Sequence, residues 1–260
     1  MFLEEILSYK KIELDTKKQH KPFKELYKQL DQAEPVRSFI NALQGETISL
    51  IAEVKKASPS KGLLCLDFNP VVLGRSYESA GAAAISVLTD EKYFQGSLEY
   101  LRQVKTETQK TPVLRKDFII DAYQLIEARV FGADAALLIV AALNKTDLHN
   151  FIQEAINLEL TPLVEVHDRQ ELDKALDAGA KVIGINNRDL KSFHVNLDTT
   201  YQLLSAIPSG IISVSESGIR NRKDIEELEK AGVKAVLVGE SIVTAGDPEK
   251  HIKELLGLVS

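Results

Sequence analysis

The chain has 260 residues, enough for one large α/β domain or two of average size, and its 44% hydrophobic content suffices for a core. Its 32 basic and 38 acidic residues leave a net charge of −6, which gives no support to non-specific nucleic-acid binding. The single cysteine, Cys65, excludes an intramolecular disulfide and fits a reducing compartment. No apolar stretch approaches the roughly 20 residues that a bilayer-spanning helix needs, and the N-terminus lacks the order of a signal peptide. We expect a cytoplasmic protein that binds neither nucleic acid nor a membrane.

The first 46 residues have helical patterning. Two apolar stripes follow the i, i+3, i+4, i+7 spacing, namely Phe23, Leu26, Tyr27 and Leu30, and then Val36, Phe39, Ile40 and Leu43. Pro22 and Pro35 stand just ahead of these stripes, where proline suits a helix start, and Gly45 suits a helix end. The pattern therefore predicts a helical segment over residues 1–46.

From Thr47 onward, short apolar runs alternate with amphipathic segments, and a repeat appears. Gly81, Gly132, Gly179 and Gly232 each close a helical segment and lead into an apolar run, and successive glycines lie 51, 47 and 53 residues apart. This spacing leaves room for two strand–helix units per repeat. The expected strands are 48–54, 84–88, 112–114, 135–140, 162–166, 182–185, 211–214 and 235–238.

Eight strand–helix units within about 210 residues match the length of a (β/α)8 barrel. A doubly wound open sheet would give no reason for a fourfold repeat, and a leucine-rich solenoid would repeat every 20–29 residues or so. We therefore predict one (β/α)8 TIM barrel over residues 47–260, with residues 1–46 packed on it as a helical extension. In such a barrel, functional groups gather at the C-terminal ends of the strands.

Charged side chains stand where four of these strands end. They are Glu53, Lys55, Lys116, Glu165 and Glu216. Burying an ionised group is costly unless it is paired or used, so several such charges indicate one shared pocket. Glu53 and Lys55 are two residues apart and share a face of their strand. They form an opposed pair at the barrel mouth if that face points inward, and an exposed strand end otherwise.

Two of these residues suit proton transfer. Lys116 could act as a general acid, with its pKa lowered by burial or by cations such as Lys55; its alternative is an ion pair with Asp117 or Glu53. Glu165 lies between two valines, and an apolar setting raises the pKa of a carboxylate. Its alternative is a solvated strand end.

The ends of the last three strands suit substrate binding. Asn186 offers a donor and an acceptor to substrate hydroxyls, and Arg188 could either bind phosphate or pair with Asp189. Gly218 and Gly239 lack side chains, so their amides can approach a ligand closely. The loops after strands seven and eight of barrels often bind phosphate. The alternative is two tight turns that merely use glycine.

Nothing in the sequence calls for a metal or a nucleotide. The five histidines lack metal-ligand spacing, and no Walker loop or Gly-x-Gly-x-x-Gly is present. His167 is separated from Glu165 by Val166 and is expected to face the other way. We expect no cofactor and no metal.

With these motifs, the chain resembles indole-3-glycerol-phosphate synthase of tryptophan biosynthesis over nearly its whole length. The resemblance includes the helical extension and an ordered series of motifs: Ile51-Ala52-Glu53-Val54-Lys55 with Ser58-Pro59-Ser60, Leu88-Thr89-Asp90-Glu91-Lys92-Tyr93-Phe94, Leu114-Arg115-Lys116-Asp117-Phe118, Pro162-Leu163-Val164-Glu165, Gly184-Ile185-Asn186-Asn187-Arg188-Asp189-Leu190 and Ser215-Glu216-Ser217-Gly218-Ile219. Each motif is modest alone, and their order makes the match specific.

The resemblance implies a cofactor-free enzyme that closes the ring of 1-(2-carboxyphenylamino)-1-deoxyribulose 5-phosphate. The products would be indole-3-glycerol phosphate, carbon dioxide and water. By similarity, Lys116 is the general acid of condensation and Glu165 an acid/base in dehydration. The residues implied in substrate binding are Glu53, Lys55, Asn186 and Glu216 for the carboxylate, hydroxyls and reacting centre; Ser58, Ser217, Gly218, Gly239 and the Glu240 backbone amide for the phosphate; and Phe94, Phe118, Leu137, Leu190 and Pro59 for the aromatic ring.

Two other interpretations remain. A phosphoribosylanthranilate isomerase-like barrel would lack the helical extension and would be expected to use a cysteine with an aspartate, yet no strand here ends in cysteine. A non-catalytic sugar-phosphate-binding barrel would have a degraded acid/base set, yet the candidate catalytic residues Lys116, Glu165, Glu53 and Lys55 are all present. The expected partner is a small-molecule sugar-phosphate substrate. We expect a monomer, and association with other tryptophan-pathway enzymes is left open.

Overall fold

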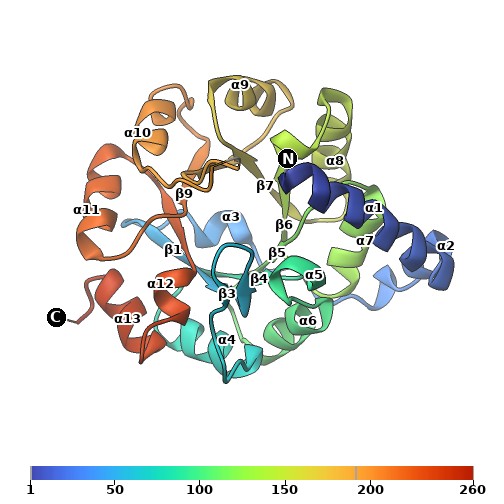
Figure 1. Ribbon diagram of the computed structural model, residues 1–260, viewed down its shortest axis with the longest axis horizontal. Coiled ribbons are helices and arrows are strands. Elements are labelled where there is room, and N and C mark those ends of the chain that lie inside the picture. The colour runs from blue at the N-terminus through green and yellow to red at the C-terminus, as the bar shows by residue number, and fades with distance from the viewer. Residues whose placement is uncertain (1, 191, 260) are drawn as a thin grey trace.

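A closed parallel barrel forms the centre of the protein in the computed structural model, which describes residues 2–190 and 192–259. Within these ranges, eight strands pair in the ring order β1-β10-β9-β8-β7-β6-β5-β4 (Figure 1). The barrel strands are β1 (Ser49–Val54), β4 (Ala84–Leu88), β5 (Val113–Lys116), β6 (Ala135–Ile139), β7 (Thr161–Val166), β8 (Val182–Asn186), β9 (Ile212–Glu216) and β10 (Ala235–Val238). The predicted (β/α)8 barrel is confirmed, and each predicted strand boundary lies within two residues of the observed one.

Helices surround the barrel on its outside (Figure 1). The helices before the barrel are α1 (Phe2–His20), α2 (Phe23–Tyr27), the 3-10 turn η1 (Leu30–Gln32) and α3 (Phe39–Ala42). Those within it are α4 (Pro70–Ser79), α5 (Glu91–Phe94), α6 (Leu98–Glu107), α7 (Ala122–Val130), the 3-10 turn η2 (Val140–Ala142), α8 (Lys145–Asn157), α9 (Arg169–Asp177), α10 (Asp198–Leu204), α11 (Arg222–Ala231), α12 (Glu240–Val243) and α13 (Pro248–Leu255). A small hairpin, β2 (Ala57–Ser58) with β3 (Gly62–Leu63), follows β1 and was not predicted.

Short polar side chains fix where the outer helices begin. Each accepts a hydrogen bond from a backbone N–H of the first helical turn, as N-cap residues do. The caps are Asn69, Asp90, Ser97, Asp121, Asn144, Asp168, Asn221 and Asp247. Most of the outer helices thus begin at a defined turn, whereas α10 and α12 begin without a side-chain cap.

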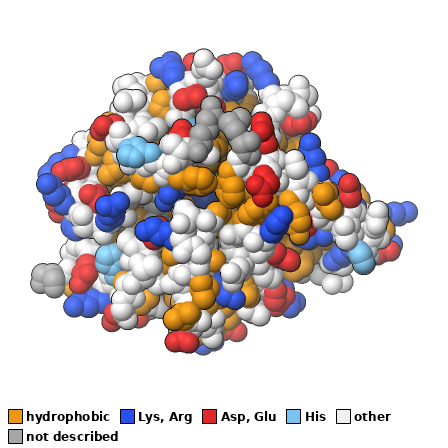
Figure 2. Space-filling view, in the orientation of Figure 1, with side chains coloured by type: hydrophobic (Ala, Val, Ile, Leu, Met, Phe, Trp, Pro, Cys, Tyr) orange, Lys and Arg blue, Asp and Glu red, His pale blue; other side chains and the backbone are white. Residues whose placement is uncertain are grey.

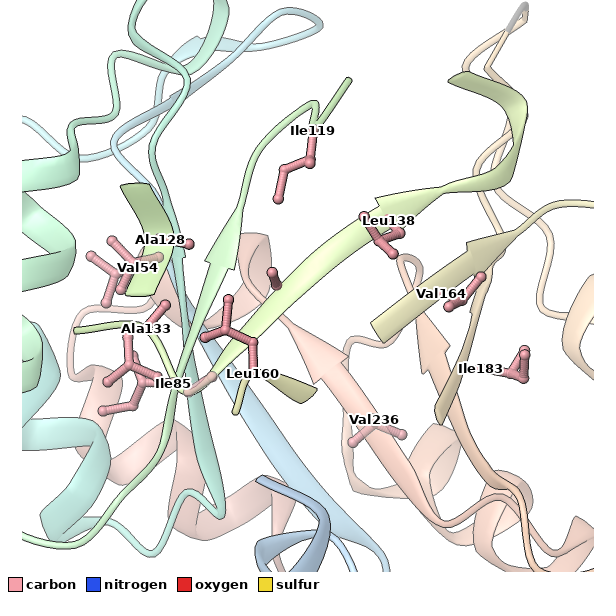
Figure 3. Packing of buried hydrophobic residues seen from close by; sticks show 14 of the residues in the cluster. Val54, Ile85, Ile119, Ala128, Ala133, Leu138, Leu160, Val164, Ile183 and Val236 are labelled. Carbon is pink, nitrogen blue, oxygen red and sulfur yellow. The ribbon is translucent and has the colours of Figure 1, made fainter. Parts of the chain in front are cut away.

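Alternation along the strands produces two apolar layers. Outward side chains such as Ile85, Leu138 and Val164 pack against the helices (Figure 3). Inward side chains fill the barrel together with Phe39 and Leu43 from the α3 region, both of which are buried. Because α3 closes the N-terminal end of the barrel, the interior opens at the C-terminal ends of the strands.

The second predicted helical stripe is helical only over α3, which includes Phe39 and Ile40 but not Val36. No helix begins at Pro35; α3 begins after Ser38, whose Oγ accepts a hydrogen bond from the backbone of Asn41. The cause is tertiary. The Arg37 backbone N–H donates to Asp134 Oδ1 (2.7 Å), and its guanidinium donates to carbonyls at the C-terminal end of α6. These bonds hold the segment extended and override its helical periodicity.

Helix α1 packs on the barrel through buried and half-buried charges. The Nζ of Lys10 lies 2.8 Å from Asp90 and 3.1 Å from Asp117, and all three side chains are almost completely buried. Further along, Lys18 pairs with Asp121, the N-cap of α7, at 2.6 Å. In the described part of the chain, neither α1 nor any other helix combines the length and apolar character needed to cross a membrane.

Candidate active site

A cavity of about 600 Å³ opens at the C-terminal ends of the strands, and hydrophobic and basic side chains meet near the middle of this face (Figure 2). Every residue predicted for the site from the sequence lines this cavity. These are Glu53, Lys55, Ser58, Pro59, Phe94, Lys116, Phe118, Leu137, Glu165, Asn186, Arg188, Leu190, Glu216, Ser217, Gly218, Gly239 and Glu240. The strand-end side chains therefore do converge, although their chemical roles remain predictions.

The strand alternation sends the charged side chains inward. Lys116 follows the inward Leu114 by two positions, and Glu216 follows Val214 in the same way. Lys116 Nζ lies 3.2 Å from Glu165 Oε2 and also hydrogen-bonds Glu216 Oε2. Neither of the ion-pair partners considered for Lys116 from the sequence is the observed one, and Glu165 is not a solvated strand end.

The pair at the end of β1 also points into the barrel mouth. Lys55 Nζ donates to Glu53 Oε1 at 2.6 Å, and the Glu53 side chain is buried. Asp117, by contrast, binds Lys10 and Arg115 outside this cluster. The cavity floor thus holds three carboxylates and two ammonium groups.

The excess of carboxylates over ammonium groups shifts the pKa values of the side chains in this cluster. Burial acts to lower the pKa of Lys116, but Glu216, Glu165 and Glu53 outweigh it and hold the pKa above its ordinary value. The expectation of a lowered pKa is therefore wrong, because its surroundings are anionic. Burial raises the pKa of Glu216 to about 7, with Lys116 opposing and the other two carboxylates adding to the rise. Burial would also raise the pKa of Glu165, but Lys116 and His167 bring it below its usual range.

We expect Glu216 to make stability fall as pH rises. A carboxyl group whose pKa is raised in the folded state binds its proton more tightly there, so its destabilisation grows between its ordinary value of 4.5 and about 7. Over this window, Glu216→Gln should gain about 3 kcal/mol relative to wild type in urea unfolding. Glu159→Gln, at a side chain 74% exposed, is the control. A difference that stays flat with pH would contradict the raised pKa.

Two glycines make room for the carboxylates. A Cβ at Gly184 would overlap Glu216 Oε1, and a Cβ at Gly239 would overlap Glu53 Oε1. Gly239 was predicted to let a ligand approach its amide; its first structural role is to accommodate Glu53. Gly184, opposite Glu165 in the register of β7 and β8, was not singled out from the sequence.

The turn after β9 is held from within. Ser217 and Gly218 both have positive φ (67° and 88°), and Ser217 Oγ donates to Asn186 Oδ1 at 2.9 Å. Asn187 Nδ2 donates to the carbonyls of Glu216 and Ser217. The buried Asn187 therefore shapes the turn, and its place in the motif beside Asn186 was the sequence signal for it.

Other polar groups lie around the same end of the cavity. Ser58 Oγ is buried and makes no hydrogen bond with the described residues. The Glu240 carboxylate accepts a hydrogen bond from Lys61 Nζ at 2.6 Å. This pairing is compatible with the prediction that only the backbone amide of Glu240 binds phosphate. Arg188 Nη1 donates to the carbonyl of Phe193 at 3.4 Å.

Part of the cavity lining is apolar. The rings of Phe94 and Phe118 lie 6.3 Å apart in a tilted arrangement, and Leu137, Leu190 and Pro59 line the same cavity. Helix α1 adds Phe2, Leu3 and Ile6, which were not assigned to the site from the sequence. The cavity is therefore amphipathic, with charged groups at its floor and flat apolar side chains at one wall.

The prediction for His167 is wrong. Residues two apart in extended chain face the same side, and His167 Nε2 lies 3.4 Å from Glu165 Oε1. Within residues 2–190 and 192–259, no group of three or more His, Cys, Asp or Glu side chains could hold a metal ion.

The closed barrel, with a lysine that lies between two carboxylates in the cavity at the strand ends, is the arrangement of a (β/α)8-barrel enzyme. The family model described as indole-3-glycerol phosphate synthase matches residues 3–255. An indole-3-glycerol phosphate synthase of Chlorobium chlorochromatii (strain CaD3) is 49% identical over 93% of this chain and 95% of its own length. One of Alkaliphilus metalliredigens (strain QYMF) is 46% identical over 98% of both chains. The chain belongs to the indole-3-glycerol phosphate synthase family, and it is a lyase of tryptophan biosynthesis that acts on a small phosphate-bearing substrate.

Solved structures agree on the fold. A 3-hexulose-6-phosphate synthase from Salmonella typhimurium is 14% identical, with a TM-score of 0.66 over 81% of this chain and 98% of that one. A mutant tryptophan synthase alpha-subunit from Pyrococcus furiosus is 16% identical, with a TM-score of 0.60 over 80% and 98%. At these identities the likeness concerns the fold alone. Family membership selects the synthase over the isomerase-like and non-catalytic alternatives.

Proposed function

We propose that the chain closes the indole ring of 1-(2-carboxyphenylamino)-1-deoxyribulose 5-phosphate, with loss of carbon dioxide and water, through the residues at the cavity floor. The observation that carries the proposal is Lys116, which lies between Glu165 and Glu216 at the inner end of an amphipathic cavity. The test is the fluorescence of newly formed indole. The chain contains no tryptophan, so the protein itself contributes little background. A folded protein that binds this substrate and forms no indole would refute the proposal.

Condensation requires an acid. As the aromatic carbon attacks the ketone carbon, the ketone oxygen takes up a proton, and Lys116 donates it. The flanking carboxylates favour the charged form of Lys116, so the lysine enters the reaction protonated. The carboxyl group then leaves as carbon dioxide, and its bonding electrons restore the conjugation of the ring.

Dehydration requires a second proton-transfer group, and Glu165 is proposed for it. The hydroxyl formed from the ketone oxygen leaves as water after protonation, while a proton is lost from the new ring. Glu165 is within reach of Lys116, so a proton can pass between the two residues between steps. The other side chains at the floor, which are Glu53, Lys55, Asn186, Glu216 and Arg188, are proposed to hold the substrate carboxylate, hydroxyls and reacting centre.

Glu165→Gln is expected to slow dehydration about tenfold to a hundredfold, a smaller loss than that of a complete acid because glutamine keeps a polar group in place. An intermediate that has lost carbon dioxide but not water should accumulate. Rapid quenching followed by chromatography would detect it. Wild-type turnover with no accumulating intermediate would remove Glu165 from this step.

The phosphate is proposed to bind at the turns after β9 and β10. Ser58, Ser217, Gly218, Gly239 and the backbone amide of Glu240 would hold it. The buried Ser58 hydroxyl without a hydrogen-bond partner among the described residues supports this assignment, because such groups usually have a partner in use. Remote binding energy from the phosphate would orient the reacting end.

A dephosphorylated substrate is expected to bind about tenfold to a hundredfold more weakly, as the loss of charge-assisted hydrogen bonds predicts. Competition against product formation would measure its affinity. Inorganic phosphate should compete with the full substrate and have little effect on the dephosphorylated one. Equal affinities for the two substrates would show that the glycine turns are only structural.

The aromatic ring is proposed to enter the slot formed by Phe94, Phe118, Leu137, Leu190 and Pro59, which matches a flat apolar group. We also propose that residues 1–46 act as an extension of the barrel at residues 47–260, and that the chain works as a monomer in the cytoplasm. One chain supplies every wall of the cavity described above. Light scattering would test the monomer, and copurification would test association with other enzymes of the tryptophan pathway.

A further inference from the structure

His167 lies just beyond β7, and it contacts the oxygen of Glu165 that Lys116 does not. Its Nε2 is 3.4 Å from Glu165 Oε1, whereas Lys116 Nζ is 3.2 Å from Oε2. The carboxylate therefore lies between two nitrogen groups, one for each oxygen. Neither contact was anticipated from the sequence.

Glu171, on α9, fixes the imidazole. Its Oε2 accepts a hydrogen bond from the His167 backbone N–H at 2.8 Å and lies 3.0 Å from Nδ1. Because an ionised carboxylate only accepts hydrogen bonds, Nδ1 carries a proton toward Glu171. The ring is then oriented so that Nε2 faces Glu165.

The Nε2 atom has no other use among the described residues. It is buried and makes no hydrogen bond of good geometry, although Glu165 lies beside it. A buried polar atom of this kind is costly unless it serves a function. Because Nε2 lies beside Glu165, the function that this position indicates is an interaction with the proposed acid/base group.

The surrounding charges favour an imidazolium. Burial acts to lower the pKa of His167, but Glu171 and Glu165, with Glu216 farther away, outweigh it and raise the pKa above 6.5. Glu165 in turn faces Lys116, His167 and Asn186, and these neighbours lower its pKa against the effect of burial. Each partner thus stabilises the charged form of the other.

We propose that His167, held by Glu171, is a positioning residue that orients Glu165 and keeps it ionised for dehydration. The inference rests on the proposed role of Glu165. An imidazolium beside Oε1 stabilises the carboxylate, so that at neutral pH Glu165 is ready to accept a proton. His167 is not among the described residues that line the cavity, so it would act through Glu165.

His167→Asn tests the inference because asparagine can still reach Glu171 but not Glu165. Removing the cation should raise the pKa of Glu165, so the acidic limb of the kcat profile should move up by about one pH unit. On that limb, turnover should fall roughly tenfold while KM stays within about twofold. His167→Gln places a neutral donor near the position of Nε2, so it should restore the orientation of Glu165 and recover only part of the turnover.

Three further measurements separate the possible outcomes. Glu171→Gln, which lies outside the cavity, should shift the limb in the same direction by less. The His167 imidazole, followed by nitrogen-15 NMR, should titrate above 6.5 and lower in Glu165→Gln. His149→Asn, at an exposed histidine of α8, should match wild type.

Two results would overturn the inference. One is a His167→Asn profile that coincides with wild type; the other is an equal loss at every pH with a lower melting temperature, which would mean a purely structural histidine. If Glu165→Gln itself keeps full turnover, the proposed role of Glu165 fails. If Glu165→Gln loses turnover while His167→Asn does not, only the inference about His167 fails.

Discussion

Replacing Lys116 by alanine is expected to cut turnover about 10²–10⁴-fold, the usual cost of losing a positioned acid. Substrate binding should be largely kept, because the phosphate turns and the apolar slot lie elsewhere in the cavity. Without the ammonium group, the ketone oxygen would have to take its proton from water or from a carboxyl group less well placed. Indole fluorescence gives kcat, and titration with the substrate gives the affinity.

The same variant carries a second signature. Lys116 offsets the charges of Glu165 and Glu216, so its removal should raise the pKa of both carboxyl groups and move the pH optimum upward. Lys145→Ala, at a lysine 69% exposed on α8, is the matched control and should behave as wild type. Thermal melting would verify that Lys116→Ala is folded. Unaltered turnover in the folded variant would remove Lys116 from the mechanism.

Most of the cavity floor was predictable because it follows from alternation. Once 112–114 and 162–166 are recognised as strands of one barrel, Lys116 and Glu165 must lie at the same end, and the inward parity of Leu114 carries over to Lys116. The same rule, applied correctly, would have placed His167 beside Glu165. The prediction failed because His167 was assigned to the wrong face of the strand, although the alternation of side chains was visible in the sequence.

Other features depended on contacts that no local pattern contains. The extended segment at Pro35 is held by bonds from Arg37 to Asp134 and to the end of α6, far along the chain. The raised pKa of Lys116 depends on three carboxylates from three strands. Such effects require the register between strands, which periodicity within one strand does not supply.

A lysine inside an apolar stripe marks the contact between α1 and the barrel. Ile6, Lys10 and Leu14 are spaced four residues apart, and all three are buried. On the buried face of an ordinary amphipathic helix, the residue between two such apolar positions would also be apolar. Lys10 is there because Asp90 and Asp117 meet it at the barrel surface, and together they hold its pKa above the ordinary value despite burial.

Lys10→Met is expected to lower the free energy of unfolding by about 3–5 kcal/mol, because it leaves two buried carboxylates without their shared cation. Methionine has a similar unbranched shape, so the loss would reflect charge more than volume. KM should rise as well, since α1 carries Phe2, Leu3 and Ile6 to the cavity wall. Urea unfolding and steady-state kinetics measure the two effects, and Lys11→Met, at the exposed neighbour, is the control.

A double-mutant cycle with Asp90→Asn isolates the pair. Asparagine caps a helix about as well as aspartate, so the start of α5 at Asp90 should survive the substitution. If Lys10 stabilises the fold through Asp90, Lys10→Met should cost at least 1 kcal/mol less in the Asp90→Asn background than in wild type. Equal costs in both backgrounds would assign the effect to Asp117 alone. A cost below about 1 kcal/mol in wild type would mean that α1 is held by its apolar contacts and not by Lys10.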